Sequence, residues 1–164
     1  MSDNYEEVID GETLLRLPPS AAHELLVGRL HDRAAAALPL NSRLRLLPPR
    51  TEVRLNARIR LCPDLAIVRP APAPAPADTF ELYLAAEVLQ PGDHHLDTVV
   101  KKQIYSDLKL PRFWMVDPRY LNVEIYGIGE YGFTLTAILA HGNPLTDPHL
   151  PGLHYPMCDL FSDL

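Results

Sequence analysis

The chain opens with two short apolar runs on either side of a turn. These runs lie within residues 5–17, and Asp10-Gly11 separates them. An Asp-Gly pair between apolar runs favours a two-residue β-turn, because both positions tolerate positive φ angles. The pattern therefore predicts an N-terminal β-hairpin whose second strand ends at Pro18-Pro19.

Two later stretches, residues 21–38 and 96–109, show apolar residues at the four-residue spacing of an amphipathic helix. The first stretch follows Ser20, which is a suitable N-cap. The second has Asp97 or Thr98 available as N-cap. Both stretches predict helices with one apolar face packed against the rest of the protein.

Runs rich in β-branched and aromatic residues, bounded by turn residues, predict the remaining strands. Together with the hairpin and the helices they give the order ββαβββ followed by βαβββ. This order predicts an α/β (α+β) fold with a mixed central sheet flanked by two main helices. The Pro-rich residues 141–156 are expected to form a loop. The predicted strands are 43–47, 51–55, 63–68, 80–91, 113–118, 121–128 and 133–139.

Length and composition indicate one folded domain. The chain has 164 residues, of which 47% are hydrophobic and 22% charged, so it can bury a core. We expect a single domain over residues 1–164, with the Pro/Ala-rich residues 69–78 as an exposed loop joining two strands. The alternative, a spacer between two domains, leaves little core to either half.

Charge and cysteine content narrow the class of protein. The net charge is −6 and the pI is near 5.6, which argues against coating of nucleic acid but not against a cleft lined by a few basic groups. Cys62 and Cys158 match no zinc or disulfide pattern. With no signal-peptide pattern and no apolar run of about 20 residues, we expect a reduced cytoplasmic location and no membrane association.

Three polar residues occupy positions where apolar ones are expected. Asp64 lies in the strand-like PDLAIV, Glu87 in the strand-like AAEVL, and Lys101 in the helix that follows. A buried carboxylate needs a cationic partner. Two acids at the ends of neighbouring strands suit Mg²⁺, and a lysine beside them can orient water and stabilise charge on a phosphoryl oxygen. These three residues are the candidate catalytic set.

Helical spacing places two further side chains on the face of Lys101. Asp97 and Tyr105 each lie four residues from it, so Asp97 can hold the ammonium group and Tyr105 can pack over its stem. The alternative is an ordinary salt bridge on a solvated helix face. Spacing alone does not decide between the two.

The order of short motifs resembles a known family. The segments PDLAIV, AAEVLQPGD, DTVVKKQIY, PRFWMVDP, NVEIY and LPGL occur in the order and at the spacing of the Uma-two family, which is described as putative restriction endonucleases. The opening IDGE and the PPS..H stretch also match, so the resemblance covers nearly the whole chain. It implies the restriction-endonuclease-like fold of the PD-(D/E)xK nuclease superfamily.

The resemblance also implies roles for the candidate residues. Asp64 and Glu87 match metal-binding acids, and the main-chain carbonyl of Val88 would complete the inner shell around Mg²⁺ or Mn²⁺. Lys101 matches a helix lysine that replaces the one usually found two residues after the glutamate, where this chain has Leu89.

One family motif is altered and two histidine positions have more than one interpretation. Gln90-Pro91-Gly92 replaces the usual Ser-Pro-Ser, which removes hydroxyl groups that could contact phosphate. His23 matches a family position and is either an accessory proton donor or phosphate contact, or an ordinary solvated or packed residue. His94-His95 suggests a metal site, but no further metal ligand lies at usable spacing.

Other conspicuous residues have ordinary explanations. The arginines of residues 43–60 either form a phosphate-binding face or belong to a solvated edge. Tyr5, Tyr126, Tyr131 and Trp114 are expected to be packing residues. The arginines are Arg43, Arg45, Arg50, Arg54, Arg58 and Arg60.

Two functions follow from the sequence. The first is a metal-dependent nuclease acting on nucleic acid, DNA in the first place, and forming a homodimer if it cuts both strands. The second is a catalytically silent nuclease-fold module for binding or assembly, which the acidic pI and the missing serines favour.

Overall fold

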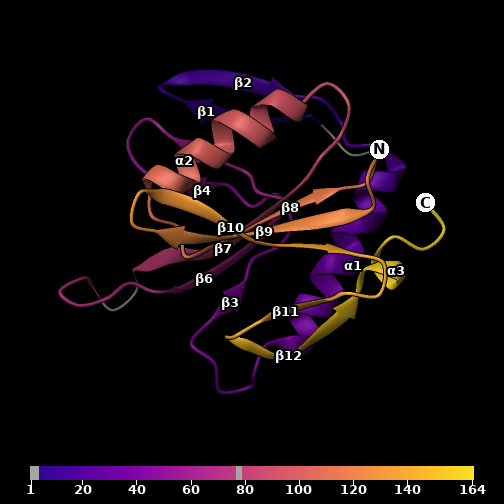
Figure 1. Cartoon of the computed structure of the whole chain (residues 1–164). Helices are drawn as coiled ribbons and strands as arrows, with labels where there is room; N and C mark the ends of the chain where they lie inside the picture. Colours follow the sequence, from indigo (N-terminus) through magenta and orange to yellow (C-terminus); the bar gives the residue numbers. More distant parts are fainter. Residues whose placement is uncertain (1–3, 77–78) are drawn as a thin grey trace.

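The central layer of the structure is a six-stranded mixed β-sheet. Its strands, in sheet order, are β10 (Gly132–Ala140), β9 (Asn122–Gly129), β8 (Arg112–Asp117), β7 (Phe80–Val88), β6 (Leu65–Pro70) and β3 (Arg45–Leu46). The computed structural model describes residues 4–76 and 79–164 (Figure 1). β7 and β8 are parallel, whereas the other neighbouring strands are antiparallel. The predicted mixed central sheet is confirmed.

A second sheet contains the N-terminal hairpin. Its strands, in order, are β2 (Glu12–Arg16), β1 (Tyr5–Ile9), β5 (Arg60–Leu61) and β4 (Val53–Arg54). Asp10 and Gly11 form the hairpin turn with φ angles of 55° and 86°, as the Asp-Gly pair predicts. The predicted hairpin is therefore confirmed. β4 pairs with β5 and not with the central sheet, and β5 itself was not predicted.

Helices cover both faces of the central sheet. α1 (Ala21–Ala37) lies on one face, and α2 (Lys102–Asp107) lies on the other together with the small sheet (Figure 1). The Ser20 side chain accepts a hydrogen bond from the His23 amide at 3.2 Å, so the predicted N-cap of α1 is confirmed. None of the helices in residues 4–76 and 79–164 is long and apolar enough to cross a membrane.

Each face of the sheet has its own apolar core. Ala86 and Val88 of β7 pack in the α1 core with Leu26, whereas Ala85 packs in the α2 core with Tyr105. This alternation follows from the two-residue period of a strand. It turns Glu87, which lies between Ala86 and Val88, toward the face covered by α2.

The C-terminal segment was predicted to be loop, and this prediction is wrong. It forms a two-stranded ribbon of β11 (Pro144–Asp147) and β12 (Leu150–Pro156), followed by the short helix α3 (Met157–Leu160). Leu145, Leu153 and Tyr155 are buried against the α1 core. Tertiary burial therefore overrides the turn preference of the prolines, which are tolerated at the ends of a two-stranded ribbon.

The second helix differs from its prediction at the beginning. A π-helical turn, η1 (Leu96–Lys101), precedes α2, and its N-terminal flanking residue is His95. Neither Asp97 nor Thr98 caps it. Asp97 pairs with cationic side chains instead, and the Thr98 hydroxyl donates to the His94 carbonyl at 2.7 Å.

The Pro/Ala-rich segment follows β6, which extends to Pro70, and leads to β7, its antiparallel neighbour in the same sheet. The Ala71 amide donates to the Thr79 carbonyl at 2.8 Å, which closes the base of the connection. Residues 77–78 lie outside the described part of the chain. The predicted loop at residues 69–78 begins two residues too early, because Arg69 and Pro70 pair with Glu81 and Phe80 in the sheet.

Candidate active site

The central strands bring Asp64 and Glu87 to the same edge of the sheet. Leu65, which follows Asp64, is paired with Ala86, which precedes Glu87. The Val88 amide donates to Asp64 Oδ2 at 2.8 Å and so fixes the Asp64 carboxylate beside the end of β7. Both side chains are buried, with exposed fractions of 4% for Asp64 and 2% for Glu87.

Lys101 reaches the same point from the connection between the parallel strands β7 and β8. A parallel pair requires a crossover connection, and here η1 and α2 provide it and cross the sheet face to which Glu87 points. Lys101 Nζ lies 2.7 Å from Glu87 Oε1 and 3.5 Å from Asp97 Oδ1. The side chain is completely buried, so a surface salt bridge on a solvated helix face is excluded.

Tyr105 also contacts the acid of β7. Its hydroxyl donates to Glu87 Oε1 at 2.8 Å, and its ring packs near Phe113 with 5.3 Å between ring centroids. The four-residue spacing thus gathers Asp97, Lys101 and Tyr105 around one carboxylate. The Tyr105 contact is with the acid itself, which spacing did not predict.

His23 of α1 contacts the Asp64 carboxylate. His23 Nε2 is 3.1 Å from Asp64 Oδ2, and the imidazole is 5% exposed. Its place in the first turn of α1 is set by Ser20, which caps the helix through the His23 amide. A solvated histidine is therefore excluded, and the His23 ring directly supports the Asp64 carboxylate.

The N-terminal hairpin contributes two site residues that sequence reasoning missed. Glu7 Oε1 lies 3.1 Å from Lys101 Nζ, and Glu7 Oε2 lies 2.5 Å from Arg16 Nη1. Glu7 also accepts a hydrogen bond from the Cys62 amide at 2.8 Å. The sequence contained a signal for the burial of Glu7. Residues 7 and 9 of a strand share one face, and Ile9 is an apolar residue that packs on the α2 core.

Arg16 attaches the hairpin to the π-helical turn. Its Nη2 atom lies 3.2 Å from Asp97 Oδ1 and 3.3 Å from Asp93 Oδ2, while Nη1 pairs with Glu7. The Arg16 side chain is buried. Its positive charge therefore compensates acids from two distant segments, and its contacts hold the hairpin over the site.

The arginines of residues 43–60 do not form a common face. Arg45 stacks on Phe80, Arg58 donates to the Asp10 carbonyl, and Arg60 pairs with Glu52. Arg50 alone among the six lies beside the candidate site, with Nη1 3.7 Å from Asp64 Oδ1. Of the two interpretations, a phosphate-binding face shared by all six arginines is therefore not supported.

Burial and charge shift the two strand acids in opposite directions. Burial, reinforced by Asp97, Asp64 and Glu7, raises the pKa of Glu87 well above its usual value despite the opposing charge of Lys101. Burial opposes ionisation of Asp64 as well, but the hydrogen bond from His23 and the charge of Lys101 hold its pKa below the usual value. Such a separation of two neighbouring carboxylates is typical of catalytic sites.

The pKa values of Lys101, Asp97 and Tyr105 are shifted for related reasons. Burial would lower the pKa of Lys101, but Glu87 and Glu7 outweigh it and raise that pKa well above its usual value. Burial raises the pKa of Asp97, and it raises the pKa of Tyr105 with the help of Glu87. Lys101 is therefore an ammonium ion and Tyr105 a neutral donor over the physiological pH range.

Most buried side-chain nitrogen and oxygen atoms that lack a hydrogen-bond partner in the described residues belong to this cluster. Such atoms are rare in folded proteins, and each calls for a functional or structural explanation. Among them, Asp64 Oδ1 and Arg50 Nη1 face each other without a hydrogen bond. The cluster's atoms are Arg16 Nε, His23 Nδ1, Glu24 Oε1, Arg50 Nη1, Asp64 Oδ1 and Lys101 Nζ. Of these, Lys101 Nζ and Glu24 Oε1 still have ion-pair partners, at 2.7 Å from Glu87 and 2.8 Å from Arg50.

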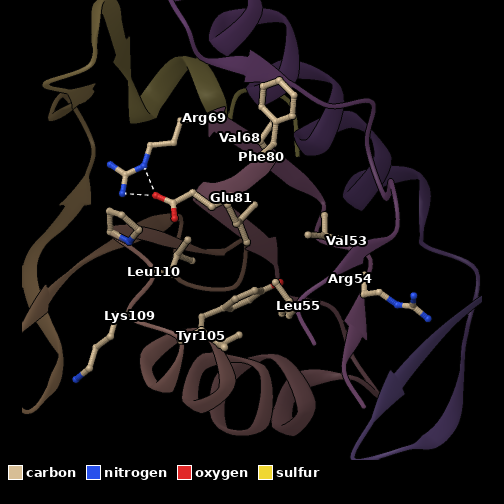
Figure 2. Close-up of a pocket in the computed structure, with 13 residues that line it drawn as sticks. Val53, Arg54, Leu55, Val68, Arg69, Phe80, Glu81, Tyr105, Lys109 and Leu110 are labelled. Atoms are coloured by element: carbon tan, nitrogen blue, oxygen red, sulfur yellow. Dashed lines mark hydrogen bonds and ion pairs between the residues drawn. The ribbon is translucent and has the colours of Figure 1, made fainter. Parts of the chain in front are cut away.

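A separate pocket of about 380 Å³ approaches the site from the other end of β7 (Figure 2). Tyr105 lines it, while the Tyr105 hydroxyl contacts Glu87. The Arg69–Glu81 ion pair lies at one side, and Lys109 points outward. Asp64 and Glu87 do not line this pocket, so it lacks the paired acids of the candidate site.

The remaining candidates lie away from the site. His94 contacts Arg119 at 2.6 Å, and no group of three His, Cys, Asp or Glu side chains in residues 4–76 and 79–164 is arranged to hold a metal ion. Trp114 and Tyr126 are buried as predicted, whereas the packing role predicted for Tyr131 is wrong because its side chain is 94% exposed. Cys62 and Cys158 are both free.

Comparison with known proteins identifies the family. The sequence matches the Uma2 family, described as "Putative restriction endonuclease", over residues 2–158. The chain belongs to the Uma2 family. Among curated proteins, none matches the sequence of this Uma2 chain.

The fold of this Uma2 protein is similar to that of a solved structure. The crystal structure of a "putative nuclease belonging to DUF820" from Anabaena variabilis matches with a TM-score of 0.76 and 14% sequence identity. The match covers 96% of this chain and 89% of that chain. At this identity the likeness shows the fold alone. Family and fold together support a nuclease.

Proposed function

We propose that this Uma2 protein is a metal-dependent nuclease of the PD-(D/E)xK type that hydrolyses phosphodiester bonds in DNA. The observation that carries the proposal is a buried cluster of three residues: Asp64 and Glu87 lie at the ends of two adjacent central strands, and Lys101 of η1 meets Glu87 there. A buried acid pair with oppositely shifted pKa values and a neighbouring cation is a candidate catalytic set on physical grounds.

The donor atoms of the site fit a divalent cation. Asp64 Oδ1 is buried without a hydrogen-bond partner. Lys101 and Tyr105 both contact Oε1 of Glu87, which leaves Oε2 for another ligand. Mg²⁺ is commonly held by one or two carboxylates together with water and substrate phosphate, and the Val88 carbonyl is the proposed third protein ligand.

The charge of the site also favours a divalent cation. Glu7, Asp64, Glu87 and Asp97 are buried acids, whereas Lys101 and Arg16 are the buried cations among the residues that the structure describes. The raised pKa values of Glu87 and Asp97 reflect burial first and repulsion among these acids second. Mg²⁺ or Mn²⁺ would offset this excess of negative charge.

The side chains of the site would have different roles in the reaction. Lys101 would hold the attacking water and stabilise charge on a phosphoryl oxygen. His23 would keep Asp64 oriented or donate a proton to the leaving group. A bound divalent ion would supply Lewis-acid stabilisation of the phosphoryl group. Glu7, Asp97 and Tyr105 would position Lys101 and Glu87.

The test combines metal binding with cleavage. Isothermal titration of Mn²⁺ should show binding to the wild type, and Asp64→Asn and Glu87→Gln should abolish it. Nicking of a supercoiled plasmid in Mn²⁺ should fall at least about a hundredfold in both variants, the size of effect expected for a residue in catalytic contact. Glu52→Gln, at an exposed acid, is the matched control. If both site variants nick the plasmid as fast as the wild type, the assigned site is wrong.

A second function has one specific observation in its favour. Lys101 and Glu7 are completely buried and ion-paired, as in a structural polar core. A silent binding or assembly module would bind no Mn²⁺ and cleave no nucleic acid, and it would retain its partner in Asp64→Asn. The same plasmid assay distinguishes this module from the nuclease.

We further propose a homodimer for cutting duplex DNA, because one site cuts one strand at a time. Light scattering after size exclusion should give twice the 18.4 kDa chain mass. A species at 18.4 kDa under cleavage conditions would contradict the dimer.

A further inference from the structure

Arg50 is held in place beside Asp64 by its backbone. It lies in the turn from Pro48 to Thr51, has a φ angle of 56°, and donates its amide to the Pro63 carbonyl at 3.0 Å. The Thr51 hydroxyl and amide both donate to the Pro48 carbonyl and close the turn. A left-handed conformation at a residue other than glycine persists only where the surroundings enforce it. The turn therefore presents Arg50 at a fixed position next to a candidate metal ligand.

The guanidinium group of Arg50 is incompletely satisfied. Nη2 pairs with Glu24 at 2.8 Å, but Nη1 is buried with no hydrogen-bond partner. Nη1 lies 3.7 Å from Asp64 Oδ1, which also lacks a hydrogen-bond partner. This distance is too long for a hydrogen bond. One edge of a fixed cation thus faces the site with donor capacity to spare.

The present partner of Arg50 is replaceable. The Glu24 side chain is 38% exposed, twice the 19% of Arg50, and an exposed ion pair contributes little stability. Tyr5 lies above the guanidinium, 5.9 Å from ring centroid to Cζ. Arg50 contacts both Glu24 oxygens through Nη2 alone, whereas a planar guanidinium can bind two oxygens of a phosphate group through two of its nitrogens.

We propose that Arg50 binds a phosphate group of the nucleic-acid substrate and that Glu24 is the counter-ion which the phosphate displaces. This assignment rests on the proposed nuclease function. The ligand is a phosphodiester of a duplex, held between Arg50 and the Asp64 end of the site. Arg45, Arg58 and Arg60 have partners elsewhere, and of the six arginines in residues 43–60 Arg50 is the one that pairs with Asp64, so the contact belongs to Arg50 itself and not to a general basic face.

The experiment measures binding of a short fluorescent DNA duplex by anisotropy, with Ca²⁺ in place of Mg²⁺ to slow cleavage. Arg50→Gln should weaken binding at least tenfold and reduce the slope of log K against log[salt] by about one, as expected for one lost phosphate contact. Arg50→Lys should retain most of the salt slope and lose part of the affinity. Glu24→Gln should tighten binding, because it frees the guanidinium.

The control is Arg60→Gln, which removes an arginine paired with an exposed acid, Glu52, away from the site. It should leave affinity and salt slope unchanged. Circular dichroism confirms that each variant is folded, and Arg50→Lys keeps the test valid if Arg50→Gln is not. Unchanged affinity in a folded Arg50 variant, or weaker binding in Glu24→Gln, would overturn the phosphate contact.

The outcome separates this inference from the nuclease proposal. If the wild type binds Mn²⁺ and cleaves plasmid while Arg50→Gln binds duplex normally, only the Arg50 assignment is wrong. If the wild type binds neither Mn²⁺ nor duplex, both proposals are wrong.

Discussion

Lys101 Nζ lies 2.7 Å from Glu87 Oε1, and neither side chain reaches solvent to a meaningful extent. Two further acids, Glu7 and Asp97, approach the same ammonium group from β1 and η1. Charges removed from water are stable only when their partners are close and complete. The pair therefore joins three distant segments of the chain through a single buried cation.

Replacing Lys101 by methionine should strongly destabilise the protein. Lys101→Met keeps an unbranched side chain one atom shorter but leaves three acids without their shared cation, and removing one partner from a buried ion pair costs about 3–5 kcal/mol. Urea unfolding at pH 8 measures the change. Lys109→Met, at an exposed lysine, is the control and should change stability by less than about 0.5 kcal/mol. Equal effects of the two substitutions would contradict a buried Lys101.

Local signals account for the parts of this site that the sequence predicts. Asp10-Gly11 specifies its turn by backbone geometry alone, and Ser20 specifies its helix start. Asp64 and Glu87 stand out because an acid inside an apolar strand requires a partner. These signals need only a few neighbouring residues, so they could be recognised without the fold.

Partners from distant segments account for what the sequence does not predict. Asp97 has the features of an N-cap, yet ion pairs with Arg16 and Lys101 place it inside η1. Near the C-terminus, Gly152 packs against the α1 backbone, where an added Cβ would lie 3.5 Å from Ala37 Cα. This is an ordinary van der Waals contact between distant segments, and no local pattern indicates it. Long-range pairing thus outweighs local preference at both places.

The stability of the metal-free protein should respond to pH through Glu87. Unfolded, this carboxyl loses its proton near its usual pKa of 4.5; folded, it keeps the proton to a higher pH. The folded state binds more protons in that interval, so the contribution of Glu87 to stability is present below pH 4.5 and is lost as pH rises through the folded pKa.

Glu87→Gln removes this titration. The stability of the wild type minus that of Glu87→Gln should therefore fall between pH 5 and pH 8, by at most about 1.4 kcal/mol per pH unit. Urea unfolding in EDTA at three pH values measures it, with Glu52→Gln as the exposed control. A difference that is constant with pH would show that burial does not raise the pKa of Glu87.

Tyr105→Phe should isolate the contribution of one hydroxyl. The ring remains to fill the core, but the donor to Glu87 Oε1 at 2.8 Å is lost. Removing a donor so that a buried acceptor is left unsatisfied costs about 1–3 kcal/mol, and unfolding in urea should show a loss in that range. Tyr131→Phe, at a fully exposed tyrosine, should change nothing. A Tyr105 variant as stable as the wild type would show that Glu87 does not depend on this donor.

The two thiols should differ sharply in reactivity, because one lines the site and the other is exposed. Burial, with the nearby charge of Glu7, raises the pKa of Cys62 to about 11, whereas Cys158 is exposed. At pH 8 only about one Cys62 thiol in a thousand is ionised, so Ellman's reagent should modify one thiol quickly and the second after unfolding. Cys158→Ser should remove the fast phase, and Glu7→Gln should accelerate the slow one. Equal rates for both thiols in the native protein would contradict the buried position of Cys62 beneath the hairpin.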